Sequence, residues 1–386
     1  MQYRPFGKLG WQASVLGFGC ARFPVVDKEY AHIDETAAIG MLRAAIDAGV
    51  NYLDSAYNYH GENSERLVGK ALQDGYRARV KVATKLPCWL VNSLEDCDRL
   101  LAEQLERLQT DQIDVYLLHG LNGHPNGWPK MRDLGVVEWA ERQIAAGKIG
   151  CMGFSFHDRY SVFQEIVDAY DGWSMCQVQY NLMDVDTQAG TKGVQYAAAK
   201  GLAVVVMEPL LGGQLANLPP VVQQVWDKAG GERTHVDAAL QWLWDQPEVS
   251  VVLSGMSTME HVEQNLASAD ASSTRPLSDE ERAAIEGVRE AFQAKRGIPC
   301  TQCRYCMPCP NGVDIPFNFY LYNFGKMYDR ASYPRMFYRD TMDPSIRADV
   351  CIACRECEER CTQQIAISEW MPTVHAVLGE GKDYPQ

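Results

Sequence analysis

The stretch GVVEWAERQIAAGKIGCMGFSF, residues 135–156, contains the helix-to-strand unit that decides the fold. Its first half places apolar residues three and four positions apart and ends at Gly147, which is typical of an amphipathic helix with a glycine cap. Its second half, IGCMGFSF, is an apolar run of strand length. Together the two halves predict a surface helix that leads into a buried strand.

The same unit recurs before and after this stretch. Amphipathic stretches of helical length alternate with eight apolar runs: VLGFGC, VNYLDSA, VKVATKL, IDVYLLHG, IGCMGFSF, MCQVQYN, LAVVVMEP and VSVVLSG. Alternation of this kind is typical of parallel βα units. Eight units predict an α/β fold with an eight-stranded βα (TIM) barrel, whose active site lies at the carboxyl ends of the strands. A doubly wound open sheet is the alternative that the pattern leaves open.

A change of composition marks a second domain. The segment LSDEERAAIEGVREAFQAKRG predicts one further helix, with Ser278 as its N-cap and Gly297 at its end. Beyond it lie eight of the 13 cysteines, many aromatic residues and little strand-like alternation. We therefore predict a barrel over residues 1–297 and a small, mainly α-helical domain over residues 298–386.

Charge and hydropathy exclude two classes of partner. A net charge of −14 without a run of Lys and Arg argues against nucleic-acid binding, which needs a basic face. The longest apolar run, residues 202–211, is interrupted by Glu208 and Pro209 and is too short to span a bilayer. The start MQYRPFGKLG has no apolar signal stretch. We expect a cytoplasmic protein that contacts neither nucleic acid nor membrane.

Four polar residues follow neighbouring strands at the catalytic end of the predicted barrel: Asp54, Tyr59, Lys85 and His119. They lie in a longer resemblance. NYLDSAYNYHGENSERLVGKAL, followed by VATKLP, DVYLLHG, GFSF, QVQYN and SGMSTMEHVEQN, is similar to the aldo-keto reductase family over about residues 1–295. The resemblance implies an oxidoreductase that interconverts a small carbonyl and an alcohol, with these four residues as its catalytic tetrad. The family's spacing of five after Asp54 selects Tyr59 over Tyr57.

The chemistry of such a tetrad can be stated in physical terms. Hydride delivery to a carbonyl builds negative charge on oxygen, so a proton donor must stand within hydrogen-bond reach. Tyr59 can donate, and a nearby ammonium lowers the pKa of a phenol by favouring its anion. We expect Lys85 to supply that ammonium, Asp54 to hold Lys85, and His119 to orient the substrate oxygen.

The resemblance also implies positions that bind a nicotinamide cofactor: Ser155, Gln177, Met207, Leu210, Gly212, Gly213, Gly255, Ser257, Gln264 and Asn265. This sequence departs from the family in having Phe156 where Asn is usual and Met207 where a Tyr often stacks on the ring. The stretch SGMSTMEHVEQN has no Lys or Arg, only His261. Since a 2′-phosphate needs charged donors, we expect NAD(P)H to be used without strong preference for NADP.

Two cysteine groups remain. Cys300, Cys303, Cys306 and Cys309 have the spacing C-x2-C-x2-C-x2-C before a proline, and Cys351, Cys354, Cys357 and Cys361 have the spacing C-x2-C-x2-C-x3-C. Disulfides are disfavoured in a reducing compartment, and zinc sites usually use pairs of cysteines rather than three successive steps of this kind. The spacing resembles bacterial ferredoxin motifs, which implies two 4Fe-4S clusters. In that pattern Cys361 joins the first three cysteines and Cys309 joins Cys351, Cys354 and Cys357.

Three functional hypotheses follow from the combination. In the first, the clusters pass electrons between a carrier, such as a ferredoxin, and a barrel of the aldo-keto reductase type. In the second, the same enzyme has purely structural clusters. In the third, the barrel binds nucleotide as a redox sensor without useful turnover. An intact tetrad favours the two enzymatic hypotheses.

Overall fold

The computed structural model describes residues 1–27, 29–228, 233–272 and 274–385. Contacts within the chain divide it into two compact units. The first, here called the barrel unit, comprises Met1–Pro209 and Asp237–Leu277, and the second, the C-terminal unit, comprises Leu210–Val236 and Ser278–Gln386. A domain boundary at residues 297/298 stays a prediction, since compact units and evolutionary domains need not coincide.

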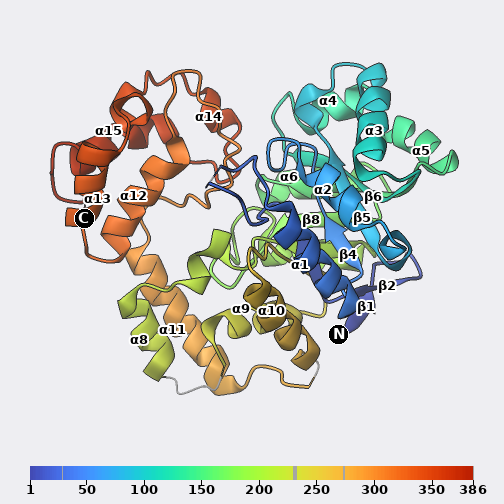
Figure 1. Cartoon of the computed structure of the whole chain (residues 1–386), viewed down its shortest axis with the longest axis horizontal. Helices are drawn as coiled ribbons and strands as arrows, with labels where there is room; N and C mark the ends of the chain where they lie inside the picture. Colours follow the sequence, from blue (N-terminus) through green and yellow to red (C-terminus); the bar gives the residue numbers. More distant parts are fainter. Residues whose placement is uncertain (28, 229–232, 273, 386) are drawn as a thin grey trace. The chain divides into compact units, whose positions relative to one another are not determined.

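The barrel unit is built on a closed barrel of parallel strands in the order β10-β3-β4-β5-β6-β7-β8-β9 (Figure 1). Closure confirms the predicted TIM barrel, and the open sheet is wrong. All eight apolar runs form the strands, which are β3 (Leu16–Gly19), β4 (Tyr52–Asp54), β5 (Lys81–Leu86), β6 (Ile113–Leu121), β7 (Ile149–Phe156), β8 (Met175–Gln179), β9 (Ala203–Met207) and β10 (Val249–Ser254).

Amphipathic helices accompany the strands. Their buried positions recur at helical spacing, as in α3, where Cys97, Leu100, Leu101, Gln104 and Leu108 are buried. The amphipathic stretches between the apolar runs are helical in the structure, as expected. These helices, with the short α4, are α1 (Glu35–Asp47), α2 (Ser64–Ala71), α3 (Leu94–Leu108), α4 (Trp128–Asp133), α5 (Val136–Ala145), α6 (Tyr160–Asp168), α7 (Gly190–Ala199), α9 (His235–Trp244) and α10 (Met259–Ala271), and 3-10 turns η1 (Tyr76–Arg79) and η2 (Cys88–Leu90) connect others.

A hairpin of β1 (Tyr3–Pro5) and β2 (Gln12–Ser14) belongs to the same core as the barrel interior. Phe6 stacks on Trp11 with ring centroids 4.4 Å apart and lies 5.5 Å from the ring of Tyr52. At Gly7, which has φ +53°, a Cβ would meet the backbone N of Ala203 at 2.6 Å. The turn can pack this closely against β9 only because it is glycine. The hairpin packs on the amino-terminal side of the strands, away from the end that carries the candidate site.

The C-terminal unit is mainly helical, as predicted. Helix α11 (Asp279–Lys295) starts at Ser278, whose side chain forms a capping box with Glu281. A separate core forms around Phe319, Tyr322 and Val374. The remaining helices are α8 (Pro220–Lys228), α12 (Ile315–Met327), α13 (Ser332–Met336), α14 (Glu356–Glu359) and α15 (Ile367–Leu378), with the short turns η3 (Leu211–Ala216), η4 (Phe337–Thr341), η5 (Pro344–Ile346) and η6 (Ala348–Val350). None of the helices in the described ranges is long and apolar enough to cross a membrane.

Candidate active site and cysteine groups

The structure brings the four predicted catalytic residues together at the carboxyl ends of β4, β5 and β6. The Lys85 Nζ atom donates to Asp54 Oδ1 at 2.7 Å and to the Ser55 carbonyl at 2.6 Å, and both charged side chains are buried. The same Nζ lies 5.0 Å from the centroid of the Tyr59 ring. The rings of Tyr59 and His119 meet edge to face, with centroids 6.2 Å apart. A phenol, an ammonium and an imidazole therefore share one small space.

Burial sets the protonation of the groups around Lys85. It raises the pKa of the Asp54 carboxyl above its usual range, and the Lys85 ammonium opposes that shift. It lowers the pKa of His119 well below its usual value, and the charges of Lys85 and His157 lower that pKa further. His119 is therefore a neutral imidazole at neutral pH, and a neutral imidazole can donate one hydrogen bond to a substrate oxygen.

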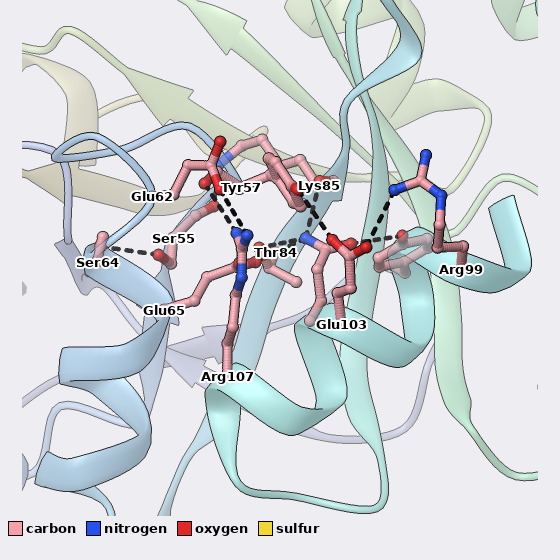
Figure 2. Close-up of polar contacts among 12 residues, drawn as sticks. Ser55, Tyr57, Glu62, Ser64, Glu65, Thr84, Lys85, Arg99, Glu103 and Arg107 are labelled. Carbon is pink, nitrogen blue, oxygen red and sulfur yellow. Dashed lines mark hydrogen bonds and ion pairs between the residues drawn. The ribbon is translucent and has the colours of Figure 1, made fainter. Parts of the chain in front are cut away.

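Glu65, a buried acidic residue on α2, forms hydrogen bonds next to the strand that carries Lys85. Glu65 Oε1 accepts hydrogen bonds from Thr84 Oγ1 at 2.5 Å and from Gln104 Nε2 at 2.6 Å, and Gln104 Nε2 also donates to the Lys85 carbonyl at 3.0 Å. Figure 2 shows Glu65 between Thr84 and the guanidinium of Arg107, whose Nη1 lies 3.4 Å from Glu65 Oε2. Burial is the main cause that raises the pKa of Glu65. This network holds the backbone of β5 in place next to the Lys85 ammonium.

Tyr57 has a different environment from Tyr59. Its hydroxyl donates to Glu103 Oε2 at 2.9 Å, and its ring lies 4.0 Å from the guanidinium carbon of Arg107 (Figure 2). Both partners belong to α3, outside the barrel. The hydroxyl of Tyr57 is thus committed to a surface helix.

Two aromatic side chains near His119 were not predicted as site residues. Trp89, in η2, is 46% exposed, and its ring centroid lies 5.1 Å from that of His119. His157 directly follows β7, is buried, and has Nδ1 3.2 Å from Gln188 Oε1. Burial, the largest cause, lowers the pKa of His157 to about 4. The sequence signal for His157 was its place at a strand end, directly after GFSF, whereas nothing in the pattern singled out Trp89.

Three of the predicted cofactor positions lie on adjacent strands of the barrel. Ser155 and Gln177 are paired across β7 and β8, and both are buried. Ser155 Oγ accepts a hydrogen bond from the Gly120 backbone N–H at 2.7 Å. Gln177 Nε2 lies 3.9 Å from the sulfur of Met207, and Gln177 Oε1 is buried without a hydrogen-bond partner among the described residues. An acceptor of this kind fits a ligand that brings an N–H group.

The predicted cofactor positions near α10 differ from one another in burial and in hydrogen-bond partners. Asn265 is buried and donates to Ser254 Oγ at 2.8 Å, so it ties the helix to the end of β10. Gln264 instead donates to Glu260 on the exposed face of the same helix, at 3.0 Å. Ser257 Oγ lies 3.4 Å from Nδ1 of His261.

Gly255 lies against a basic side chain from outside the stretch SGMSTMEHVEQN. A Cβ at Gly255 would meet the Cβ, Cγ and Cδ atoms of Arg22 at 3.1–3.3 Å. Arg22 is exposed and follows β3. A guanidinium is therefore carried on a stem that packs at the carboxyl end of β10.

The remaining predicted cofactor positions, Leu210, Gly212 and Gly213, belong to the C-terminal unit. Gly212 and Gly213 have φ values of 66° and 94°, within the η3 turn. Other residues rarely adopt two successive left-handed conformations, so the pair of glycines forms a tight turn with exposed backbone.

The eight clustered cysteines lie in two loops of matching conformation. Gln302 and Arg304 in the first loop, and Ala353 and Arg355 in the second, all have φ between 56° and 66°. Backbone N–H groups point at the thiols: those of residues 302, 353 and 365 approach the sulfurs of Cys300, Cys351 and Cys361 at 3.4 Å each. Hydrogen bonds to sulfur are a means by which proteins tune cluster thiolates.

Neighbouring thiols raise the pKa of two buried cysteines. After burial, the causes that raise the pKa of Cys306 are the charges of Cys303, Cys300, Cys361 and Cys357, so cysteines of both groups contribute. Burial and Glu358 raise the pKa of Cys357 to about 11, with contributions from Cys309 and Cys351. Among the residues that the structure describes, no group of three or more histidine, cysteine, aspartate or glutamate side chains has the geometry to hold a metal ion.

Comparison with known proteins adds independent evidence. Residues 15–290 match the aldo/keto reductase family, and residues 299–366 match a 4Fe-4S dicluster domain. L-galactose dehydrogenase of Arabidopsis thaliana is 24% identical over 75% of this chain and 95% of its own length. Methylglyoxal reductase YeaE of Escherichia coli is 28% identical over 72% of this chain and 94% of its own.

Solved structures agree with these relatives. An aldo-keto reductase of Bacillus halodurans in its holo form has a TM-score of 0.63 and 26% identity, over 75% of this chain and 96% of that chain. One from Klebsiella pneumoniae, in complex with NADPH, has a TM-score of 0.61 and 26% identity over the same shares. The family match covers most of the chain, and the closed barrel with its buried lysine–aspartate pair fits it. The chain therefore belongs to the aldo/keto reductase family of oxidoreductases, with a C-terminal region of the 4Fe-4S dicluster type.

Proposed function

We propose that the barrel unit interconverts a small carbonyl compound and its alcohol, with Tyr59 as general acid and base. The observation that carries this proposal is the buried pair of Lys85 and Asp54, whose ammonium lies 5.0 Å from the Tyr59 ring. The relatives named L-galactose dehydrogenase and methylglyoxal reductase support a small oxygenated substrate.

A nicotinamide cofactor, when bound, supplies hydride to the carbonyl carbon. Tyr59 gives its proton to the carbonyl oxygen as negative charge builds there. The Lys85 ammonium stabilises the phenolate that remains, and Asp54 holds that ammonium in place at 2.7 Å. Neutral His119 donates a hydrogen bond to the same substrate oxygen and so fixes its direction. In the reverse reaction the Tyr59 phenolate takes the proton of the alcohol.

The chain's residues suit a nicotinamide. The buried, unpartnered Oε1 of Gln177 can accept from the carboxamide N–H group, and Ser155 lies opposite it on β7. The Klebsiella relative is in complex with NADPH. We propose NAD(P)H as the cofactor, with the other predicted positions of the barrel unit, Met207, Gly255, Ser257, Gln264 and Asn265, as its further contacts. The predicted contacts at Leu210, Gly212 and Gly213 stay a prediction from the family resemblance.

For the C-terminal unit we propose two 4Fe-4S clusters. The spacing of the two cysteine groups and the match to a 4Fe-4S dicluster domain support ligation of one cluster by Cys300, Cys303, Cys306 and Cys361, and of the other by Cys351, Cys354, Cys357 and Cys309. Each cluster carries one electron, so two clusters together can hold the pair that a hydride carries. We propose that they exchange electrons with an external carrier such as a ferredoxin. Purely structural clusters are the alternative.

A single experiment tests the role of Tyr59. Tyr59→Phe keeps the ring but removes the proton donor, so turnover of methylglyoxal, chosen as a probe from the named relative, should fall by roughly 10²-fold or more. Tyr57→Phe is the matched control, because its hydroxyl bonds to Glu103 on α3. Nucleotide binding, followed by fluorescence, should survive in both variants. Full activity of Tyr59→Phe would contradict the proposal.

The role of the clusters needs a separate experiment. The anaerobic protein is reduced with dithionite, freed of excess reductant, and mixed with the probe carbonyl and oxidised nicotinamide, which takes two electrons and one proton before it passes hydride to the carbonyl. If the clusters supply electrons to the barrel, two electrons and two protons convert the carbonyl to its alcohol, and the visible absorbance of oxidised clusters returns. If the clusters are structural, the absorbance stays that of the reduced protein.

A further inference from the structure

The loop that carries Tyr59 has a backbone conformation that most residues avoid. His60, Gly61 and Glu62 have φ values of 52°, 58° and 72°, so three successive residues lie in the left-handed region. Glycine adopts this region freely, but the other two residues persist there only where the surrounding structure holds them. The position of Tyr59 therefore depends on what holds its neighbours.

His60 anchors the loop on one side. Its Nε2 accepts a hydrogen bond from the Phe23 backbone N–H at 3.1 Å, and its Nδ1 lies 2.7 Å from the Tyr30 carbonyl. Because Nε2 accepts, Nδ1 carries the ring hydrogen and donates it. The ring is buried and stacks on Tyr30 at 4.5 Å. Both nitrogens of His60 are thus bound to the segment that follows β3.

Arg107, on α3, anchors the loop on the other side. Its Nη2 pairs with Glu62 Oε2 at 2.6 Å, and its Nη1 approaches the Tyr57 carbonyl at 3.4 Å. The guanidinium carbon also lies 4.0 Å from the Tyr57 ring centroid. Figure 2 shows the Arg107 guanidinium close to both Tyr57 and Glu62. Arg107 therefore contacts the chain at Tyr57, two residues before Tyr59, and at Glu62, three residues after it.

The anchor is itself tied to the strand that carries Lys85. Arg107 Nη1 lies 3.4 Å from Glu65 Oε2, and the other oxygen of Glu65 accepts from Thr84 and Gln104. Thr84 directly precedes Lys85 on β5. A continuous set of hydrogen bonds therefore links the Tyr59 loop to the strand that carries Lys85. The Lys85 ammonium must lie next to the Tyr59 hydroxyl.

We propose that Arg107 is a positioning residue for Tyr59, acting through Glu62 and Tyr57. The inference rests on the proposed function, in which Tyr59 moves the proton. Proton transfer needs heavy atoms within roughly 2.6–3.2 Å, and a misplacement of about 1 Å can lower a rate about 10²-fold. We call the contacts of Arg107 with Glu62 and Tyr57 the clamp. Loss of the clamp should slow the proton step while substrate and nucleotide still bind.

The main test is Glu62→Gln in the complete, cluster-loaded protein. Glu62 is half exposed, and its loss leaves the buried contact between Arg107 and Glu65 in place, so the variant should fold. With methylglyoxal as the probe, we expect kcat to fall roughly tenfold with KM within about twofold of wild type, and the solvent deuterium isotope effect on kcat to rise. A purely structural role would not change the isotope effect.

The matched control is Glu35→Gln, which removes the exposed ion pair of Glu35 with Lys70 on α2. That pair has no contact with the Tyr59 loop, so kcat and the isotope effect should stay at wild-type values. Arg107→Lys keeps a charge but loses the planar fork. It should lower kcat as Glu62→Gln does, and the double variant should lose no more than the worse single variant, because the two residues act as one unit.

The outcomes separate this inference from the proposed function. If Tyr59→Phe is inactive while Glu62→Gln has wild-type kcat and isotope effect, the clamp inference is overturned and the role of Tyr59 stands. Additive effects of Glu62→Gln and Arg107→Lys would also overturn the clamp. If Tyr59→Phe stays active, the proposed function is wrong, and the clamp inference, which rests on it, is wrong as well.

Discussion

The barrel unit and the C-terminal unit assemble their reactive groups in different ways. In the barrel unit, Asp54, Lys85 and His119 come from three strands, and the buried charges satisfy one another, as the 2.7 Å contact of Lys85 with Asp54 shows. In the C-terminal unit, the cysteines come from two short segments, and the sulfurs of Cys300 and Cys351 accept hydrogen bonds from backbone N–H groups. The barrel thus pairs side-chain charges drawn from distant parts of the sequence, whereas the cysteines are gathered by local spacing.

The two units are therefore sensitive to different kinds of substitution. Removing one member of a self-satisfied buried pair leaves a charge without its partner in a place that water does not reach. Removing one thiol takes away a ligand of a proposed cluster, and with it the part of the folding free energy that cluster binding contributes. Substitutions should therefore affect folding and activity in the first unit, and cofactor content together with stability in the second.

The largest effect should come from Lys85→Met. It leaves Asp54 buried without its ammonium, so we expect a loss of about 3–5 kcal/mol of unfolding free energy together with activity. The double variant with Asp54→Asn should regain most of the stability but none of the activity. Urea unfolding followed by tryptophan fluorescence measures the first effect. Stability unchanged in Lys85→Met would contradict the view that the pair is self-satisfied.

The buried histidines predict a pH effect that is confined to the barrel unit. Burial lowers the pKa of His157 to about 4 and also lowers the pKa values of His119 and His60, so the unfolded chain binds more protons than the folded chain below about pH 6.5. Stability should fall by roughly 1.4 kcal/mol per pH unit for each histidine as the pH drops from 6.5 toward 4.

His157→Gln should remove the share of this pH dependence that belongs to His157, while the shares of His119 and His60, whose pKa values burial also lowers, remain. Urea midpoints at pH 7, 6 and 5 for wild type and variant make the comparison, with His32→Gln as the control at a histidine outside the site. Equal slopes for wild type and His157→Gln would show that His157 is protonated in the folded protein.

The third prediction concerns the thiols. Anaerobically purified protein should contain about eight iron and eight sulfide per chain, because eight cysteines have cluster spacing. Cys351→Ser should lose roughly half of the iron, and so should Cys309→Ser, since both are proposed ligands of the same cluster. The double variant should keep the other half. Zinc in place of iron, or a double variant without iron, would contradict the proposed sets of ligands.

Much of the barrel site was predictable from sequence because it follows from topology. Once eight βα units are recognised, polar residues at the strand ends, such as Asp54 and Lys85, are expected at one end of the barrel. The cysteine groups were predictable for a different reason, because their spacing is local. Neither strand order nor local spacing predicts the contact between Glu65 and Arg107, which lie 42 positions apart in the sequence.

A weaker signal for these supporting residues was present in helix α3. Gln104 and Arg107 continue the buried stripe of Leu100 and Leu101 at helical spacing, although their polarity suggested an exposed face. A polar residue on the apolar stripe of a helix indicates a buried partner. Which partner it meets depends on how α2 and α3 pack, and one sequence does not determine that. The same holds for Arg22, whose neighbour Gly255 is more than 200 residues away.

The smallest expected effect is the discrimination between NADPH and NADH. Residues 254–265 contain no Lys or Arg, and His261 is their one basic side chain. A charge-assisted hydrogen bond contributes roughly 1.5–3 kcal/mol, so without one the two cofactors should differ less than tenfold in kcat/KM. The structure adds one competing group, because the stem of Arg22 packs on Gly255. Titrating both cofactors against wild type and Arg22→Gln separates the cases: a ratio near one in both proteins supports the prediction. A preference for NADPH above tenfold that Arg22→Gln abolishes would assign the phosphate contact to the loop after β3.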